Sequence, residues 1–145
     1  MKIIPKPRTG NAKETAANLR KVGERVPLAL ASALYAEGHG LIADAMPLTP
    51  LRDKMGGSLR ASNFVGVPTI SGGRATMEVG FGGAATKYAL FVHEMTGSNI
   101  NWSEPGTGAK YLERPFDQLQ PKLANNLAQR MAAFLKRNGF TPAKG

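Results

Sequence analysis

The sequence predicts an α+β domain, in which a long N-terminal helix and a C-terminal amphipathic helix pack on a small antiparallel sheet with long Gly-rich loops. Two stretches, residues 11–45 and 115–138, repeat apolar residues at three- and four-residue steps, as on the buried face of a helix. Residues 58–81 between them are rich in β-branched and aromatic residues, which favours strands.

The chain of 145 residues has the length of one ordinary domain. We expect a basic extended arm over residues 1–12, a single α+β domain over residues 13–139 and a flexible tail over residues 140–145. There is no cysteine, which excludes disulfide bonds, thiolate metal ligands and cysteine nucleophiles. The fold must therefore depend on packing or on contacts between subunits.

The first predicted helix begins after candidate capping residues at positions 9–11 and ends before Pro47. Pro27 lies within it and costs one backbone hydrogen bond. The sequence therefore predicts either a kink near residues 23–27 or a second helix that has Pro27 in its first turn. Both alternatives remain open at this point.

The middle of the chain is predicted to form a loop and a hairpin. Residues 46–57 contain prolines and a glycine pair, which is typical of a loop. Strands are predicted over residues 58–67 and 74–81, and Gly72 and Gly73 suit the turn of a hairpin between them. Residues of the second strand alternate between apolar and other side chains, so one face of the sheet is expected to be covered.

Residues 86–94 are apolar and too short for periodicity to separate strand from helix, and we favour a short helix. Residues 95–109 contain three glycines, a proline and few apolar residues, which predicts a mobile loop. This loop carries Trp102, the only tryptophan. An exposed tryptophan in such a loop would be unusual for a monomer.

The last helix is the element with the clearest pattern. Leucines and a methionine recur at four-residue steps from Leu119 to Leu135, and Gly139 follows as a C-terminal cap. Pro121 is tolerated in a first turn, so the helix is predicted to begin near Gln118. We expect this helix and the first to cover one face of the sheet, which leaves the other face to a partner or to water.

The net charge of +9 is concentrated at the two ends of the chain. Residues 1–25 and residues 110–145 each carry seven basic and two acidic groups, and the middle is close to neutral. Basic ends indicate contact with phosphate, or else a surface that favours solubility or matches an acidic protein partner. We prefer the second interpretation.

No window approaches the roughly 18 to 20 consecutive apolar residues that a membrane-spanning helix needs. The first residues include two prolines and no apolar run of signal-peptide length. The sequence therefore predicts a protein that is made in the cytoplasm and has no membrane partner.

The pair His93 and Glu94 is the only feature that suggests a metal hydrolase. A zincin needs a second histidine four residues after the first, but Gly97 occupies that position and His39 lies in the first helix. Nucleophile elbows, phosphate-binding loops and dinucleotide-binding fingerprints do not occur in the sequence. We therefore predict no metal site, no cofactor and no enzymatic activity.

Two charged residues near the predicted sheet have a structural interpretation. Glu94 is expected to accept backbone N–H groups of the following turn or to pair with Arg60. Arg60 either faces a negative partner or supports Glu94 or Asp44, and we prefer the structural role.

Three segments form a recognisable series along the chain. The first combines a proline and a threonine with a later Leu-Arg-x-Ser stretch, at Pro47, Thr49, Gly57, Ser58, Leu59, Arg60, Ala61 and Ser62. The second is a Tyr-Ala pair followed by a valine, a glutamate and a turn, at Tyr88, Ala89, Val92, His93, Glu94, Thr96 and Gly97. The third opens the last helix, at Tyr111, Leu112, Arg114, Pro115 and Phe116.

This series resembles a family of bacteriophage tail-component proteins, which act in tail completion and head-to-tail joining in long-tailed phages. The resemblance covers most of the chain. Two departures concern turns, because residues 50–56 are inserted in the first segment and Met95 precedes Thr96 and Gly97 in the second.

The resemblance implies a structural virion protein whose copies form a ring of six or twelve subunits at the neck or at the head-proximal end of the tail. Its implied partners are other copies, neighbouring neck or connector proteins, the tail tube or tail terminator protein, and DNA in the channel. The candidate interface residues are Arg60, Tyr88, Glu94, Trp102, Arg114 and Phe116. The alternative is a small basic nucleic-acid-binding domain, although no known nucleic-acid-binding motif is present.

Overall fold

A computed structural model of the chain describes residues 12–51, 58–83, 88–97, 100–102 and 104–140. The predicted basic arm lies outside the described residues except for Ala12, and the predicted tail lies outside them except for Phe140. The α+β class is confirmed. The elements in chain order are α1 (Ala12–Ala45), a 3-10 turn η1 (Met46–Leu48), α2 (Ser58–Ala61), β1 (Asn63–Val65), β2 (Thr69–Ser71), β3 (Arg74–Thr76), β4 (Val79–Phe81), α3 (Ala89–Glu94) and α4 (Glu113–Arg137).

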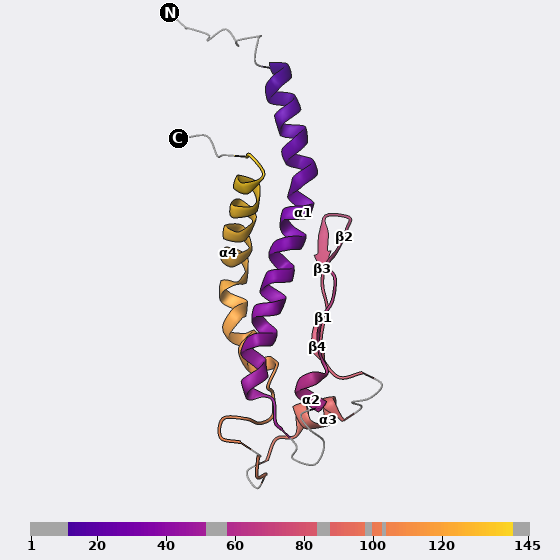
Figure 1. The fold of residues 1–145 in the computed structure, drawn as a ribbon, viewed down its shortest axis with the longest axis vertical. Helices are drawn as coiled ribbons and strands as arrows, with labels where there is room; N and C mark the ends of the chain where they lie inside the picture. The colour runs from indigo at the N-terminus through magenta and orange to yellow at the C-terminus, as the bar shows by residue number, and fades with distance from the viewer. Residues whose placement is uncertain (1–11, 52–57, 84–87, 98–99, 103, 141–145) are drawn as a thin grey trace, which may run out of the picture.

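The long helix α1 lies between α4 on one side and the strands on the other (Figure 1). The layering thus differs from the prediction that both long helices cover the sheet. Helix α1 packs against β1, β2 and β4, whereas α4 packs mainly against α1. The short helices α2 and α3 gather at the end of the molecule where α1 ends and α4 begins.

Helix α1 runs unbroken through Pro27, so the alternative of a second helix starting there is wrong. The proline ring removes the N–H that would bond to the carbonyl of Gly23. Pro27 and Gly23 are both exposed, and Gly23 has open space around it, so water can hydrate the freed carbonyl. The helix therefore continues through Pro27 with one backbone hydrogen bond fewer.

The two long helices pack through small residues and through one ion pair whose carboxylate is buried. Ala29 and Ala33 are buried, which lets the helix backbones approach closely. Between the helices the buried carboxylate of Glu37 accepts hydrogen bonds from Arg130 Nε at 2.5 Å and from Asn126 Nδ2 at 3.2 Å. This pairing fixes the register of α4 along α1, because a shift would leave a buried charge without partners.

The hairpin is confirmed, but the predicted strands are shorter and interrupted. β1 pairs with β4 and β2 pairs with β3, both antiparallel, as two separate ladders along one ribbon. Gly72 and Gly73 both have positive φ, 56° and 74°, as a tight type I′ hairpin turn requires. Between the ladders Gly66 N donates to Glu78 O at 2.7 Å, and an added Cβ on Gly66 would lie 2.9 Å from that oxygen.

The start of the first predicted strand is wrong, because residues 58–61 form the helical turn α2. The turn is closed by local side-chain hydrogen bonds, which sequence patterns do not register. Ser62 Oγ donates to Leu59 O at 2.6 Å, and Asn63 Nδ2 donates to Arg60 O at 2.7 Å.

Helix α4 begins at Glu113, five residues before the predicted start at Gln118. The proline in the first turn of α4 is therefore Pro115, whereas Pro121, which was predicted to lie there, is inside the helix. The predicted C-terminal cap is confirmed, since Gly139 has a φ of 87°. Phe140 N bonds to Leu135 O and Gly139 N bonds to Lys136 O, which together form a Schellman motif.

The stretch Ala16–Leu48 is long enough and apolar enough, by length and composition alone, to cross a membrane. One such helix is weak evidence, because the core helix of a water-soluble protein meets the same criteria. In this chain the stretch includes the Glu37 side chain, which is buried against α4 and paired with Arg130.

Candidate functional site

The short elements at one end of the molecule enclose a small apolar core, which we call the corner. Three buried residues form it: Leu59 of α2, Ala89 of α3 and Tyr111 just before α4. Partly buried apolar residues pack against them, namely Leu48, Phe81, Tyr88, Val92 and Leu112. The corner therefore joins segments that are more than 50 residues apart in the chain.

Each of the three buried residues belongs to a different one of the three segments recognised in the sequence. Leu59 lies in the Leu-Arg-x-Ser segment, Ala89 in the Tyr-Ala segment and Tyr111 in the segment that opens the last helix. The order of these segments is visible in the sequence, whereas the meeting of their buried residues is visible only in the fold.

Tyr111 is the central side chain of the corner and is only 2% exposed. Its hydroxyl donates a hydrogen bond to the backbone oxygen of Ala89 at 2.9 Å. Its ring packs edge-on against Phe81 and His93, with ring centroids 5.2 Å and 5.0 Å apart. Burial disfavours the charged phenolate and raises the pKa of Tyr111 to about 12.

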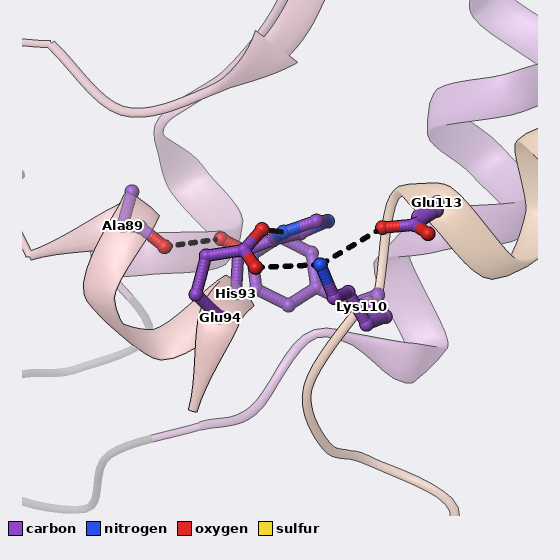
Figure 2. Close-up of polar contacts among 6 residues, drawn as sticks. Ala89, His93, Glu94, Lys110 and Glu113 are labelled. Atoms are coloured by element: carbon purple, nitrogen blue, oxygen red, sulfur yellow. Dashed lines mark hydrogen bonds and ion pairs between the residues drawn. The ribbon is translucent and has the colours of Figure 1, made fainter. Parts of the chain in front are cut away.

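A chain of charged side chains crosses the surface from the end of α3 to the start of α4 (Figure 2). Glu94 bonds to His93 Nδ1 at 2.8 Å and to Lys110 Nζ at 2.5 Å, and Lys110 also pairs with Glu113 at 3.0 Å. The hydrogen bond from Lys110, and after it that from His93, lowers the pKa of Glu94. The hydrogen bond that Lys110 donates to Glu94, followed by the one to Glu113, raises the pKa of Lys110.

The same cluster contains three residue types that bind metal ions. Ligand atoms of His93, Glu94 and Glu113 lie within 4.8 Å of one another. The ammonium group of Lys110 already bonds both carboxylates and supplies the positive charge that a metal ion would bring. The cluster is therefore explained as an ion-pair network that ties α3 to α4.

The predicted partner of Arg60 is wrong. Arg60 does not pair with Asp44, nor with Glu94, which is paired with Lys110. Instead, Arg60 Nη2 donates to the Glu104 carboxylate at 2.8 Å, and Arg60 Nε donates to Thr49 O at 2.7 Å. Among the described residues, the Glu94 carboxylate bonds to His93 and Lys110 and not to a backbone N–H of the following turn, where Thr96 N bonds to the backbone oxygen of Glu94. Arg60 thus ties α2 to the end of η1 and to the loop before α4.

The loop around Trp102 forms no helix or strand over its described residues, as predicted. Trp102 is half-buried rather than exposed, and its indole lies against Gly108, where an added Cβ would come within 3.4 Å of Nε1. Gly108 N in turn donates to Leu48 O at 3.1 Å. The tryptophan therefore helps fold the loop back on the corner.

The remaining predicted interface residues lie at the edge of the corner. Tyr88 directly precedes α3 and packs against the apolar cluster. Arg114 and Phe116 lie in the first turn of α4, and both are exposed. The six predicted residues are thus gathered around one end of the molecule, although they do not form one contiguous cluster.

An apolar groove of about 380 Å³ opens beside the corner, between β1, β4, α3 and the start of α4. Its lining includes Phe64, Val79, Phe81, Leu90, His93 and Leu112. Leu90 is 72% exposed and Phe64 is 44% exposed, and the neighbouring Phe91 is 67% exposed. A concentration of exposed apolar side chains of this kind is typical of an interaction surface.

Sequence reasoning missed Leu90, Phe91 and Phe64. A signal was present, because α3 has four consecutive apolar residues from Ala89 to Val92. A helix of six residues with one buried face cannot cover all of them, so some must be exposed.

The burial of Tyr111 predicts a loss of stability at alkaline pH. The ordinary pKa of tyrosine is 10.0 and the folded value is about 12, so the folded chain holds the phenolic proton more tightly than the unfolded chain. The contribution is fully present below pH 10 and is lost as the pH rises toward about 12.

The measurement is the free energy of unfolding across this pH range for the native chain and for Tyr111→Phe. The native chain should lose stability more steeply, because it carries the buried phenol at position 111 and Tyr111→Phe does not. Parallel curves would show that Tyr111 does not titrate as a buried phenol.

A scan against protein-family models, a search of curated proteins and a search of solved structures each find no match for this chain. What the corner does is therefore inferred from its residues and their arrangement.

Proposed function

We propose that the chain is a structural subunit of a long-tailed bacteriophage, which acts in tail completion or head-to-tail joining by forming a ring at the neck or at the head-proximal end of the tail. The observation that carries the proposal is the corner. Its buried core takes one residue from each segment that resembles the phage tail-component family, and it leaves an apolar groove open beside it.

The groove has the chemistry of a subunit contact. Leu90 and Phe64 in its lining, and Phe91 next to Leu90 in α3, present apolar surface to solvent. Burial of such surface contributes about 25 cal/mol per Å². Aromatic side chains are enriched at the centres of protein interfaces, where they fill pockets on the partner. A neighbouring subunit that covered these residues would gain this stabilisation.

The polar groups beside the groove support a structural role. Glu94, Lys110 and Glu113 bond to one another, and Arg60 bonds to Glu104 and to the backbone. Such a network holds α2, α3 and the start of α4 in fixed positions around the apolar surface. These groups serve the geometry of the corner, so we propose assembly rather than catalysis as its function.

The expected ring has unlike surfaces in contact, because cyclic closure with more than two subunits joins one face of each copy to a different face of the next. The corner would be one of these two faces. Six copies would match the symmetry usual for a tail, and twelve would match the head side. Neighbouring neck proteins and the tail tube or terminator protein are the proposed further partners, and the virion is the proposed location.

The test replaces the exposed apolar residues of α3 in the double variant L90S/F91S. Both side chains are mostly exposed, so the fold and its melting temperature should change little. Association with other copies or with neck and tail-tube proteins should weaken by about 30-fold to 1,000-fold, as expected for two interface residues that each contribute 1 to 2 kcal/mol.

The matched control is Leu28→Ser, which removes an equally apolar side chain that is 56% exposed in the middle of α1. It should assemble like the native chain in light scattering and in complementation of tail assembly. Normal assembly of the double variant would exclude the corner as the contact surface.

A further inference from the structure

The whole net charge of the chain belongs to its two terminal segments. Residues 28–129 contain eight basic and eight acidic residues, so they are neutral as a set. Residues 1–27 contain seven basic and two acidic residues, and residues 130–145 contain four basic and none acidic. The net charge of +9 therefore comes from these two segments alone.

The fold brings the described parts of these segments to the same end of the molecule. Helices α1 and α4 run antiparallel, and the first turns of α1 extend beyond the end of α4 at the same end of the molecule (Figure 1). Arg25 Nη1 donates to Asn138 Oδ1 at 3.3 Å, which places the last turn of α4 beside the part of α1 that contains Arg25. We call this the basic end, made of the described residues Lys13, Arg20, Lys21, Arg25, Lys136 and Arg137.

The cations of the basic end are available to an external partner. All six side chains are exposed. The ion pairs among the described residues involve Arg60, His93, Lys110 and Arg130, so none of the six is neutralised by one. Glu14 and Glu24 are the only acidic residues of α1 in this stretch, which leaves the basic end with an excess of four positive charges.

We infer that the basic end binds the phosphate backbone of double-stranded DNA without reading its sequence. The positions from Lys13 to Arg25 span about 18 Å along the helix at about 1.5 Å per residue, and duplex DNA presents one phosphate charge per about 1.7 Å of its axis. Long, exposed cations distributed over this length can therefore reach several phosphates.

An acidic protein partner is disfavoured by the composition of this end. Protein interfaces have apolar and aromatic centres and are depleted in lysine. Leu19 is the large exposed apolar residue among residues 13–25, and no aromatic residue lies in that stretch. The surface consists mainly of charged side chains on long stems, as expected for contact with a polyanion rather than with a folded protein.

The inference deepens the proposed function and rests on it for location, because in a ring around the tail channel the basic end would face the DNA. The binding itself does not depend on assembly and is measured on the full-length chain alone. Failure of DNA binding and failure of ring formation are therefore separate results.

The experiment measures the affinity of the full-length chain for a random duplex of about 30 base pairs. Fluorescence anisotropy gives this affinity at salt concentrations from about 50 to 200 mM. The variant R20Q/K136Q/R137Q removes three cations of the basic end. Each lost phosphate contact lowers the slope of log affinity against log salt by about 0.9, so the slope should fall by about 2 to 3 and the affinity at low salt by about tenfold or more.

The matched control is R74Q/R114Q/K122Q, which removes the same charge from exposed cations outside the basic end. It should keep the slope and most of the affinity of the native chain. Equal losses in both variants would overturn the site, because binding would then follow total charge. Equally tight and equally salt-sensitive binding to poly-glutamate would overturn the assignment to DNA phosphates.

Discussion

Replacing Tyr111 with alanine is expected to lower the free energy of unfolding by about 3 to 5 kcal/mol, as for other large aromatic residues removed from a core. The side chain is 2% exposed and packs against Phe81 and His93, so its loss leaves a cavity in the corner. The backbone oxygen of Ala89 also loses its hydrogen-bond donor. The melting temperature should fall by roughly 10 °C.

Two further variants separate the causes of this loss. Tyr111→Phe keeps the ring and removes only the hydroxyl, so it should cost about 1 kcal/mol at neutral pH. Tyr35→Ala removes an aromatic side chain that is 41% exposed on α1, and its cost should be clearly smaller than that of Tyr111→Ala. If Tyr111→Ala and Tyr35→Ala melted at the same temperature, the corner would not be a core.

Replacing Gly38 with leucine is expected to separate the hairpin from α1. A Cβ added at Gly38 would meet the methyl group of Met77 and would lie 3.1 Å from a methyl carbon of both Val65 and Val79. The Met77 side chain can move, but β-branched valines are stiff, so the larger leucine must displace the strands. Overpacking of this kind costs about 1 to 3 kcal/mol or more.

The matched control is Gly40→Leu, two residues further along α1, where an added Cβ meets nothing within 4 Å. Leucine favours a helix over glycine by up to about 1 kcal/mol, so this variant should be neutral or stabilised. Chemical denaturation of both variants gives the comparison. Equal stabilities would show that the hairpin does not pack on α1 at Gly38.

The elements set by local sequence are the ones that could be predicted. The long helices followed from apolar periodicity, the hairpin turn from the pair Gly72 and Gly73, and the end of α4 from Gly139, each of which the structure confirms. Helix α2 could not be predicted in this way. It is closed by local hydrogen bonds from the Ser62 and Asn63 side chains to the turn, and such bonds leave no periodic pattern in the sequence.

The layering and the site depended on tertiary contacts, which a single sequence does not show. Glu37 and Arg130 are 93 residues apart, and their pairing fixes how α4 lies on α1. Arg60 is predicted to support Glu94 or Asp44, but its partner is Glu104, which belongs to a loop without a periodic pattern. The segments of the corner could be noted in order, whereas their meeting around Tyr111 required the fold.

The central claim is that the chain acts by assembling through its apolar corner, and the mass of the purified protein in solution tests it most directly. Light scattering on the protein alone, and again after mixing with candidate neck and tail-tube proteins, should give a ring of six or twelve copies of the 15.4 kDa chain in at least one of these conditions. A chain that stays monomeric in all of them and does not bind those proteins would contradict the account.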